Sequence, residues 1–564
     1  NKHIRPVSLF YVQLENRLEK LPFNPFVYDM GNSPTSSPTI EQAEELTQDA
    51  ILPRMTLKEW IKKVSKENQI PSDSKKIKPV HDLKSKALSK NENPSKVDIK
   101  NGWLTFNGKV ITGKTANVMW WRGSLRDHDV NSASAHVTRF VPGKTGKGFT
   151  DNLNEVVEEF KENNVTALNH NYGLWYERRM DDHERVRRID ADVWAPFYEQ
   201  PFARTGTDLA WDHLSKYNLN KPNVWYWYRL EKFADLAENE GQLLIQQQYF
   251  QHNILEAGAH WSSSPWRSAN NVNDTGFPEP VPYAGDKRIF MAEQFYDVTH
   301  KHRKKLHQQF IRQSLENFKD NSNVIHFTSA EYTGPLHFME FWLDEVKKYK
   351  DEISGKGIIG LSATKDVQDA ILNDNKREDI VDLIDIRYWH YREDGSTYAP
   401  EGGKNLAPRQ HARKMKTGKE TEEQVYRAVN DYRNMQPEKA VLYSTNVGPR
   451  FGWAVLMAGG SLANIPKIDI SGFYESLSMM KVSDNKTYKD DFWTLENKEE
   501  SYLFYLKNTN SIQIDLSDYI GKYEVYWINS NDGRIILKTT IKGGTKPILS
   551  SPKGKGVVLF IKKK

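Results

Sequence analysis

The feature that most constrains the fold of this chain is a short apolar run that recurs along it and ends in polar or aromatic residues. The clearest copy covers residues 383–386 and is followed by Arg387, Tyr388, Trp389 and His390. Segments of helical periodicity separate the copies, and alternation of strands with helices favours a parallel sheet. Parallel strands of an α/β barrel bring their C-terminal ends to one face, so we expect the side chains that follow these runs to share one site.

The number of these runs fits a (β/α)8 TIM barrel. The predicted strands cover residues 117–122, 165–170, 243–249, 324–330, 357–363, 382–388, 440–445 and 461–465. Helical patterns lie between several of them, for example at 152–163 and 335–349. A doubly wound open sheet is the alternative, but no glycine-rich phosphate loop follows the first predicted strand. The predicted fold class is therefore α/β, a TIM barrel with additions at both ends.

The pattern changes near both ends of the chain, and 564 residues exceed what a single core usually holds. Residues 1–112 combine a Lys-, Ser-, Asn- and Pro-rich extension with two Asn-Gly pairs, which predict a small β element. Residues 113–468 are assigned to the catalytic barrel. Residues 469–564 contain short alternating strands with turn residues between them, which predict an antiparallel β-sandwich.

Composition narrows the classes of function. The chain has no cysteine, which rules out thiolate catalysis, and its net charge of +5 does not suggest a nucleic-acid partner. No apolar run is long enough for a membrane span. The chain starts at Asn1, and we expect a signal peptide to have been removed from a periplasmic or secreted protein. The 16 Trp and 26 Tyr often stand beside polar residues, an arrangement that suits stacking on sugar rings.

Glu331 is the leading candidate for acid–base chemistry because it directly follows the fourth predicted strand. Retaining glycosidases need two carboxylates about 5–5.5 Å apart. The seventh predicted strand, 440–445, has no carboxylate at its end, and Asp385 and Asp366 are weaker candidates for the second group. The alternative is that Glu331 only forms a structural ion pair with an arginine.

Elimination from a uronic acid does not need a carboxylate pair. A cation holds the sugar carboxylate, a base removes the proton at C5, and an acid protonates the oxygen that departs from C4. Arg387 and Lys365 are the predicted cations, and the remaining predicted catalytic groups are His390, Tyr249 and His170 as bases, with Glu331 or Tyr391 as the acid. Further predicted substrate contacts are Trp389, Tyr172, Arg178, His252, Tyr332 and Trp175. For each histidine, a purely structural role is the alternative, and none has the spacing of a zinc motif.

Several motifs resemble known families. Residues 106–123 and the motif at 329–332 resemble the barrel entry and the acid/base position of the clan of (β/α)8 glycoside hydrolases. Residues 502–533 are similar to the collagen-binding-type β-sandwich of bacterial polysaccharide-degradation proteins. The stretches 170–176 and 386–391 resemble a family from polysaccharide-utilisation loci that is related to the oligosaccharide dehydratase of marine ulvan breakdown. That resemblance implies action on a uronic acid at the non-reducing end.

Taken together, the residues and the resemblance predict a carbon–oxygen lyase that acts on acidic, uronate-containing oligosaccharides, for example from ulvan. Its product would be a 4,5-unsaturated uronyl sugar, and the reaction would need neither a cofactor nor a metal. Two alternatives stay open: a retaining glycoside hydrolase with Glu331 as acid/base, and a non-catalytic carbohydrate-binding protein that uses the same aromatic residues.

Overall fold

A parallel sheet forms the centre of the computed structural model, which describes residues 96–118, 127–141, 144–173, 197–210, 215–255, 261, 264–279, 292–483 and 491–564. The sheet has seven strands in the order β16-β13-β12-β11-β10-β6-β4, and each neighbouring pair runs parallel. In chain order they are β4 (Lys114–Asn117), β6 (Val165–His170), β10 (Leu243–Phe250), β11 (Val324–Ala330), β12 (Ile358–Ser362), β13 (Leu383–Ile386) and β16 (Ala440–Tyr443). The α/β class is thereby confirmed.

The eighth predicted strand, at 461–465, is irregular instead of extended. Leu462 has a φ of 51°, in the left-handed region, which interrupts a strand. The segment nevertheless lies between the two edges of the sheet: the Ser461 N–H donates to the Val441 carbonyl of β16 (2.8 Å), and the Leu462 N–H donates to the Ile111 carbonyl just before β4 (2.9 Å). The first strand ends at Asn117, and most of the predicted strand 117–122 lies outside the described residues.

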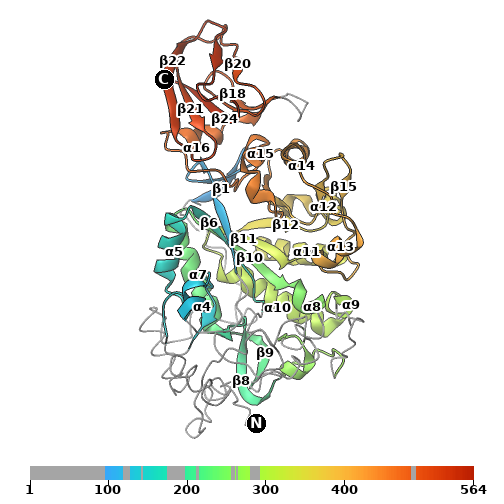
Figure 1. Ribbon diagram of the computed structural model, residues 1–564. Coiled ribbons are helices and arrows are strands. Elements are labelled where there is room, and N and C mark those ends of the chain that lie inside the picture. The colour runs from blue at the N-terminus through green and yellow to red at the C-terminus, as the bar shows by residue number, and fades with distance from the viewer. Residues whose placement is uncertain are drawn as a thin grey trace.

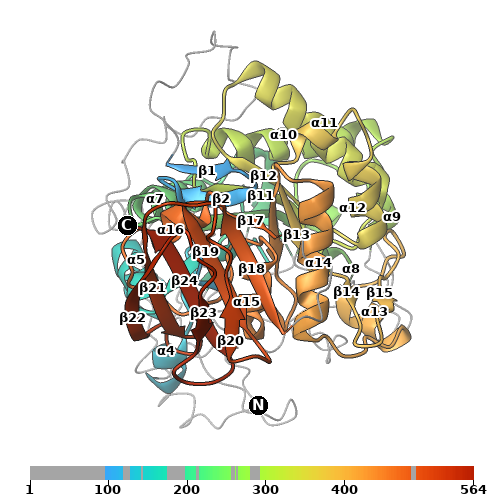
Figure 2. The same ribbon diagram turned by 90° about the horizontal axis from the view of Figure 1, so that it is seen from above.

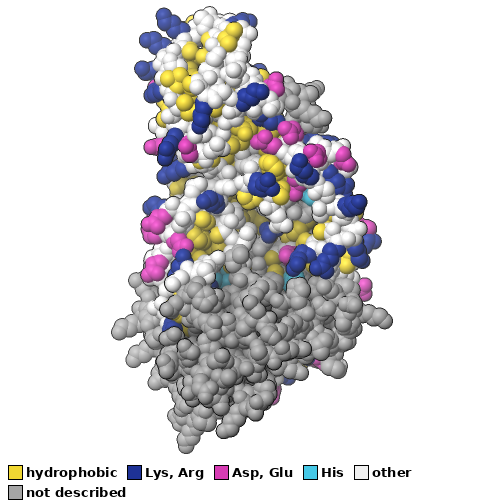
Figure 3. Space-filling model, in the orientation of Figure 1, with side chains coloured by type: hydrophobic (Ala, Val, Ile, Leu, Met, Phe, Trp, Pro, Cys, Tyr) yellow, Lys and Arg dark blue, Asp and Glu magenta, His cyan; other side chains and the backbone are white. Residues whose placement is uncertain are grey.

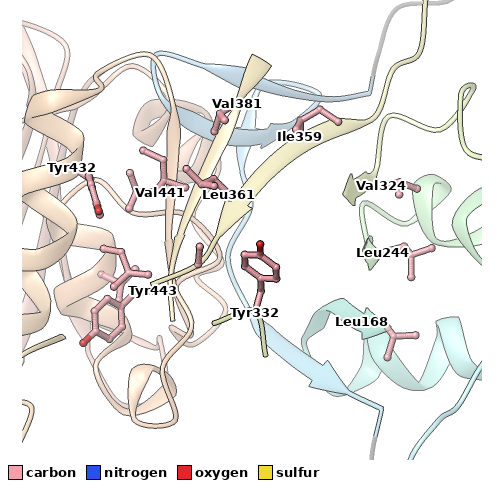
Figure 4. Close-up of a cluster of buried hydrophobic side chains, with 14 of the residues drawn as sticks. Leu168, Leu244, Val324, Tyr332, Ile359, Leu361, Val381, Tyr432, Val441 and Tyr443 are labelled. Atoms are coloured by element: carbon pink, nitrogen blue, oxygen red, sulfur yellow. The ribbon is translucent and has the colours of Figure 1, made fainter. Parts of the chain in front are cut away.

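Helices cover the outside of the sheet (Figures 1 and 2). They are α5 (Leu153–Glu162), α7 (Val224–Asn239), α10 (Lys301–Asn317), α11 (Leu336–Glu352), α12 (Lys365–Leu372), α14 (Glu422–Met435) and α15 (Gly452–Met457). In α5 the buried residues recur at helical spacing, and the Asn152 side chain caps the N-terminus by accepting from the Asn154 N–H. Figure 4 shows part of the resulting core, to which the sheet contributes alternate residues such as Leu168, Leu244 and Val324.

The inner face of the sheet has its own apolar cluster. Its members from the strands are Ala167, Leu243, Ile245, Ile325, Phe327, Ile358, Leu383, Ala440 and Leu442. Val97 and Leu104 join this cluster from the N-terminal sheet of β1 (Val97–Lys100), β2 (Trp103–Phe106) and β3 (Lys109–Val110), and Ile111 joins it directly after β3. Both predicted Asn-Gly turns are present there, with positive φ at each residue. This small sheet lies between the parallel sheet and the C-terminal sheets (Figure 1).

The C-terminal part is antiparallel, as predicted. Its six-stranded sheet has the order β17-β18-β19-β24-β21-β22, and β20 pairs with β23. The strands are β17 (Lys481–Val482), β18 (Phe492–Asn497), β19 (Ser501–Leu506), β20 (Ser511–Gln513), β21 (Lys522–Asn529), β22 (Ile535–Lys542), β23 (Ile548–Ser550) and β24 (Val557–Lys563). One face packs on the helices, where Trp493 stacks on Tyr426 of α14 at 4.4 Å. Lys and Arg side chains gather along one side of these sheets (Figure 3), and lysines on edge strand β22 discourage further strand pairing.

Shorter helices and two-stranded pairs lie in the segments outside the larger sheets. They are α4 (Asp127–Ser132), α8 (Gln251–Leu255), α9 (Ala292–Phe295), α13 (Pro408–Lys414), α16 (Phe473–Leu477) and the strand pairs β5 (Arg139–Phe140) with β7 (Phe197–Tyr198), β8 (Phe202–Leu209) with β9 (Ser215–Pro222) and β14 (His390–Tyr391) with β15 (Thr397–Tyr398). None of the helices in the described part of the chain has the length and apolar character that crossing a membrane requires. The predicted domain boundaries at 112 and 468 stay predictions.

Candidate functional site

Glu331 and His252 meet where two neighbouring strands end. Glu331 follows β11 and has a φ of 57°, an uncommon conformation for a residue other than glycine. Backbone strain of this kind costs roughly 1–3 kcal/mol and concentrates at functional sites. His252 lies on α8, directly after β10, and its Nδ1 is 3.4 Å from Glu331 Oε2. Because β10 and β11 pair in parallel, their ends bring the two side chains together.

The surroundings of Glu331 favour its ionised form. Burial alone would raise the pKa of this carboxyl group, but the hydrogen bond and charge of His252, with Arg387 and Arg409, outweigh burial and lower the pKa. The Glu331 side chain is 36% exposed, so it remains accessible to a ligand. A carboxylate beside an imidazole can share one proton with it. The pair is therefore equipped to give and take a proton.

Arg387 and Asp385 lie on the inner face at the end of β13. Burial would lower the pKa of Arg387, but Tyr388, Asp385 and Glu331 outweigh it and raise the pKa. Burial raises the pKa of Asp385 despite Arg387, Ser444 and Ser362, and the Ser362 hydroxyl donates to Asp385 Oδ2 at 2.8 Å. Among the described residues, no hydrogen bond or ion pair joins the Arg387 side chain. Its guanidinium is thus available to a ligand.

A cavity of about 370 Å³ lies against this inner face. Apolar side chains of three strands, Ile245, Phe327 and Leu442, form one part of its wall. The polar residues that line it are Lys114, Thr115, Asn117, Asn169, Asp385, Arg387, Ser444, Thr445, Asn446, Ser461 and Asn464. Within the described ranges, no group of three or more His, Asp or Glu side chains is arranged to hold a metal ion. The cavity suits an organic ligand with polar groups.

A family model described as "Domain of unknown function (DUF6298)" matches residues 1–480. The chain belongs to the DUF6298 family. None of the curated proteins matches it. Comparison of this DUF6298 chain with known proteins therefore supplies a family but no activity.

Several solved structures are similar to the DUF6298 chain. A glycoside hydrolase family 5 protein from Bacteroides vulgatus is 11% identical with a TM-score of 0.43, covering 85% of this chain and 96% of its own. A protein described as "Glycoside hydrolase" is 11% identical with a TM-score of 0.42, covering 83% and 97%. A glycoside hydrolase family 30 endoxylanase from Clostridium papyrosolvens is 11% identical with a TM-score of 0.32, covering 83% and 100%. The function has to be argued from the site itself.

Tyr249 and His170, two of the bases predicted for the DUF6298 chain, lie between the sheet and its helices. The Tyr249 hydroxyl is 2.9 Å from Nδ1 of His307 on α10, and burial raises its pKa well above the usual value. His170 Nδ1 is 3.2 Å from Oε1 of Gln246, and burial lowers the His170 pKa to about 4. Both side chains are fully buried among residues that pack on the outer face. The structure does not bring them to Glu331.

Three other predicted residues gather on the outer side near α12 and α14. The Lys365 ammonium donates to Asp369 Oδ2 (2.7 Å) and lies 4.8 Å from the ring centre of Trp389. The Trp389 indole N–H donates to Gln368 Oε1, and the Tyr391 hydroxyl donates to Asp431 Oδ2. Each polar group in this cluster therefore already has a protein partner.

The remaining predicted contacts are spread over several places. Tyr332 is buried and its hydroxyl donates to the Pro335 carbonyl (2.7 Å), while Tyr172 is buried beside Phe310. His390 is the first residue of β14 and is buried, with its Nε2 2.9 Å from the Thr417 carbonyl. Trp175 and Arg178 lie outside the described residues. Of the predicted set, Glu331, His252 and Arg387 are the members that the structure brings together.

Sequence reasoning missed two polar groups near the cavity. Asn169 precedes His170 on β6 and lines the cavity from the inner face. Glu420 lies just before α14, and its Oε2 accepts from the hydroxyls of Tyr443 and Thr445, while its Oε1 is 3.7 Å from His390 Nδ1. The alternation of apolar residues along β6 could have identified Asn169, because Ala167 on the same face belongs to the inner cluster.

Proposed function

We propose that this protein is a carbohydrate-active enzyme that cleaves a C–O bond of a sugar, with Glu331 and His252 as its proton-transfer pair. The observation that carries the proposal is this pair at the ends of β10 and β11, within electrostatic reach of Arg387 on the wall of a cavity. We also propose that segment 461–465 completes the parallel sheet as the eighth member of a TIM barrel, since it is hydrogen bonded to both sheet edges. Active sites of such barrels lie at the strand C-termini.

Hydrolysis of a glycosidic bond is the first candidate reaction. It commonly uses two carboxyl groups whose surroundings separate their pKa values. Glu331 has a lowered pKa and Asp385 has a raised one, and Arg387 influences both. In this reaction Asp385 protonates the departing sugar oxygen, and ionised Glu331 removes a proton from the attacking water. Asp385 takes this role because, within the described segments, it is the carboxyl group that lines the cavity.

β-Elimination from a uronic acid is the second candidate, and Arg387 favours it. The Arg387 guanidinium forms no hydrogen bond or ion pair with the described residues and can bind both oxygens of a sugar carboxylate. That contact stabilises the negative charge that develops when ionised Glu331 removes the proton at C5. His252 then protonates the oxygen that leaves C4. For this reaction we propose an ulvan-type oligosaccharide as the substrate and a periplasmic or secreted location for the protein.

One incubation series tests the proposal and separates the two reactions. Neutral and uronate-containing oligosaccharides are treated with the protein, and reducing ends and ultraviolet absorbance of a conjugated double bond are followed in parallel. Hydrolysis yields reducing ends without absorbance, whereas elimination yields absorbance. If Glu331→Gln cleaves any of these sugars as fast as the unaltered protein, the proposed catalytic pair is wrong. Sugar binding without cleavage by either protein would identify a carbohydrate-binding protein.

A further inference from the structure

The cavity against the inner face is closed at the end where the strands begin. There the apolar inner cluster includes Val97, Leu104 and Ile111 of the N-terminal segment, which are at most 5% exposed. A hydrogen bond holds this segment in place: the Trp103 indole N–H donates to the Met480 carbonyl (3.0 Å). The described residues therefore leave a long chain no passage through this end. Glu331 lies at the opposite end, where strand β11 finishes, and a ligand that enters from there cannot pass through.

The walls above this floor are polar and carry an unused hydrogen-bonding group. Asn169 is 6% exposed, and its amide N–H donates to Asn117 Oδ1 at 2.7 Å. Its own Oδ1 is buried and has no hydrogen-bond partner in the part of the chain that is described. A buried polar group of this kind calls for a partner, because leaving it unpaired is costly. A ligand hydroxyl that donates to Asn169 provides one.

The cavity also contains a carboxyl group that can form a hydrogen bond with a sugar oxygen. Asp385 is 1% exposed and lines the same cavity, where Ser362 already occupies its Oδ2. Ile245, Phe327 and Leu442 offer an apolar surface between these polar groups. A sugar ring has this combination of an apolar face and a rim of hydroxyls. The volume of about 370 Å³ is near the lower end of ligand cavities, which span roughly 300–1,000 Å³.

We propose that this cavity is a recognition pocket for one terminal sugar ring, so that the enzyme works from a chain end. The assignment rests on the proposed function for the place of bond cleavage, beside Glu331 and Arg387. The ring lies on Phe327 and donates a hydroxyl to Asn169, while Asp385 faces the oxygen that joins this ring to the next sugar. The rest of the oligosaccharide extends outward past Glu331. An internal segment of a polymer cannot adopt this position because the floor is closed.

Two measurements with defined sugars test the pocket. Methyl glycosides of glucose, galactose, mannose, xylose, rhamnose and glucuronic acid are titrated by ligand-observed NMR, first on the unaltered protein and then on Asn169→Ala. We expect at least one to bind, and about tenfold more weakly to the variant, as loss of one buried hydrogen bond predicts. Hexasaccharides of glucose, mannose, xylose and galacturonic acid are then digested briefly. Early products from a cleaved hexasaccharide should be one unit and five units, by mass spectrometry.

Controls separate pocket, fold and function. Asn154→Ala, on the exposed side of α5, should bind as the unaltered protein does, and melting temperatures show whether each variant is folded. If Asn169→Ala does not fold, Ser444→Val narrows the same cavity and should weaken binding. No bound glycoside, equal binding by a folded Asn169→Ala, or early products of two, three and four units would overturn the pocket. Glycoside binding that depends on Asn169 without cleavage of any sugar would keep the pocket and refute the proposed function.

Discussion

Side chains at the same strand ends have different roles on the two faces of the parallel sheet: those on the inner face line a cavity, and those on the outer face pack in the core. On the inner face, Asp385 and Arg387 line a cavity, and the charge of Arg387 favours the ionised form of Glu331. On the outer face, Tyr249 is 2.9 Å from His307 within a layer of stacked aromatic rings. Both sets contain titratable residues at or near the ends of strands. Position along a strand is therefore not enough to make a residue part of the site, and the face on which its side chain lies decides.

Strand β13 shows the rule within four residues. Leu383 belongs to the inner cluster and Asp385 lines the cavity, whereas Ile384 and Ile386 pack in the outer core. Arg387 continues the inner series, as period-two alternation requires. Beyond the end of the strand the alternation stops, and Trp389 lies with Lys365 on the outer side. The comparison thus predicts large catalytic effects on one face and effects on stability on the other.

Replacing Glu331 by Gln should have the largest effect. The variant keeps the side-chain shape and the backbone conformation but cannot exchange a proton, so we expect a rate loss of about 10²–10⁴-fold. Initial rates on the best oligosaccharide measure it, and the melting temperature should change little. Glu401→Gln, at a side chain that is 66% exposed, is the matched control and should keep full activity. A fully active Glu331→Gln variant would show that Glu331 does not transfer the proton, and that the inner face is not catalytic in the way proposed.

Replacing Arg387 by Met should be the next largest effect. The change removes the guanidinium from the cavity wall, where Lys114 is the other cation among the described residues. The kcat/KM on uronate-containing sugars should fall by about 10²-fold, since truncating one partner of a buried charge pair costs roughly 2–5 kcal/mol. Neutral sugars should lose less. The exposed Arg413→Met on α13 serves as control. Equal losses on acidic and neutral sugars would show that Arg387 does not bind a sugar carboxylate.

Tyr249→Phe should affect stability and leave catalysis intact. It removes the hydroxyl beside His307 Nδ1 and leaves that buried nitrogen without its partner, at a cost of about 1–3 kcal/mol. Urea unfolding measures the loss, and kcat and KM should match those of the unaltered protein. Tyr519→Phe, in the C-terminal part, is only partly buried and should be neutral. A loss of kcat by orders of magnitude would instead support the sequence-based prediction that Tyr249 is a base.

The sequence predicts the sheet better than it predicts the site. Strands β6 and β11 coincide with the predicted 165–170 and 324–330, because the apolar residues at the start of each run typify strands covered on both faces of a parallel sheet. Segment 461–465 was wrong as a strand, since the left-handed backbone at Leu462 leaves no trace in its hydrophobic pattern. Glu420 reaches the end of β16 from a loop 20 residues or more away in sequence, a contact that only folding creates.

The pH dependence of stability should reveal the buried histidines of the outer face. Burial lowers the pKa of His326 and His307 to about 3 and that of His170 to about 4. Between these values and about 6.5 the unfolded chain binds protons that the folded protein does not, so stability falls as the pH decreases from 6.5 towards 4. Each histidine contributes up to about 1.4 kcal/mol per pH unit to this loss in the free energy of unfolding. His326→Gln should reduce the loss between pH 7 and pH 5 in urea unfolding, whereas the exposed His302→Gln should not.

Lys365→Met should have the smallest effect and gives the sharpest test of the boundary between the faces. Lys365 is 23% exposed, pairs with Asp369 and lies over the Trp389 ring, so its loss should cost no more than about 1 kcal/mol of stability. Because these partners lie on the outer side, kcat/KM on acidic and neutral sugars should be unchanged. Lys419→Met, at a side chain that is 73% exposed, provides the baseline. A tenfold lower kcat/KM of Lys365→Met on uronate-containing sugars alone would show that this lysine reaches the substrate. The helix α12, which begins with Lys365, would then belong to the catalytic site and not to a purely structural outer face.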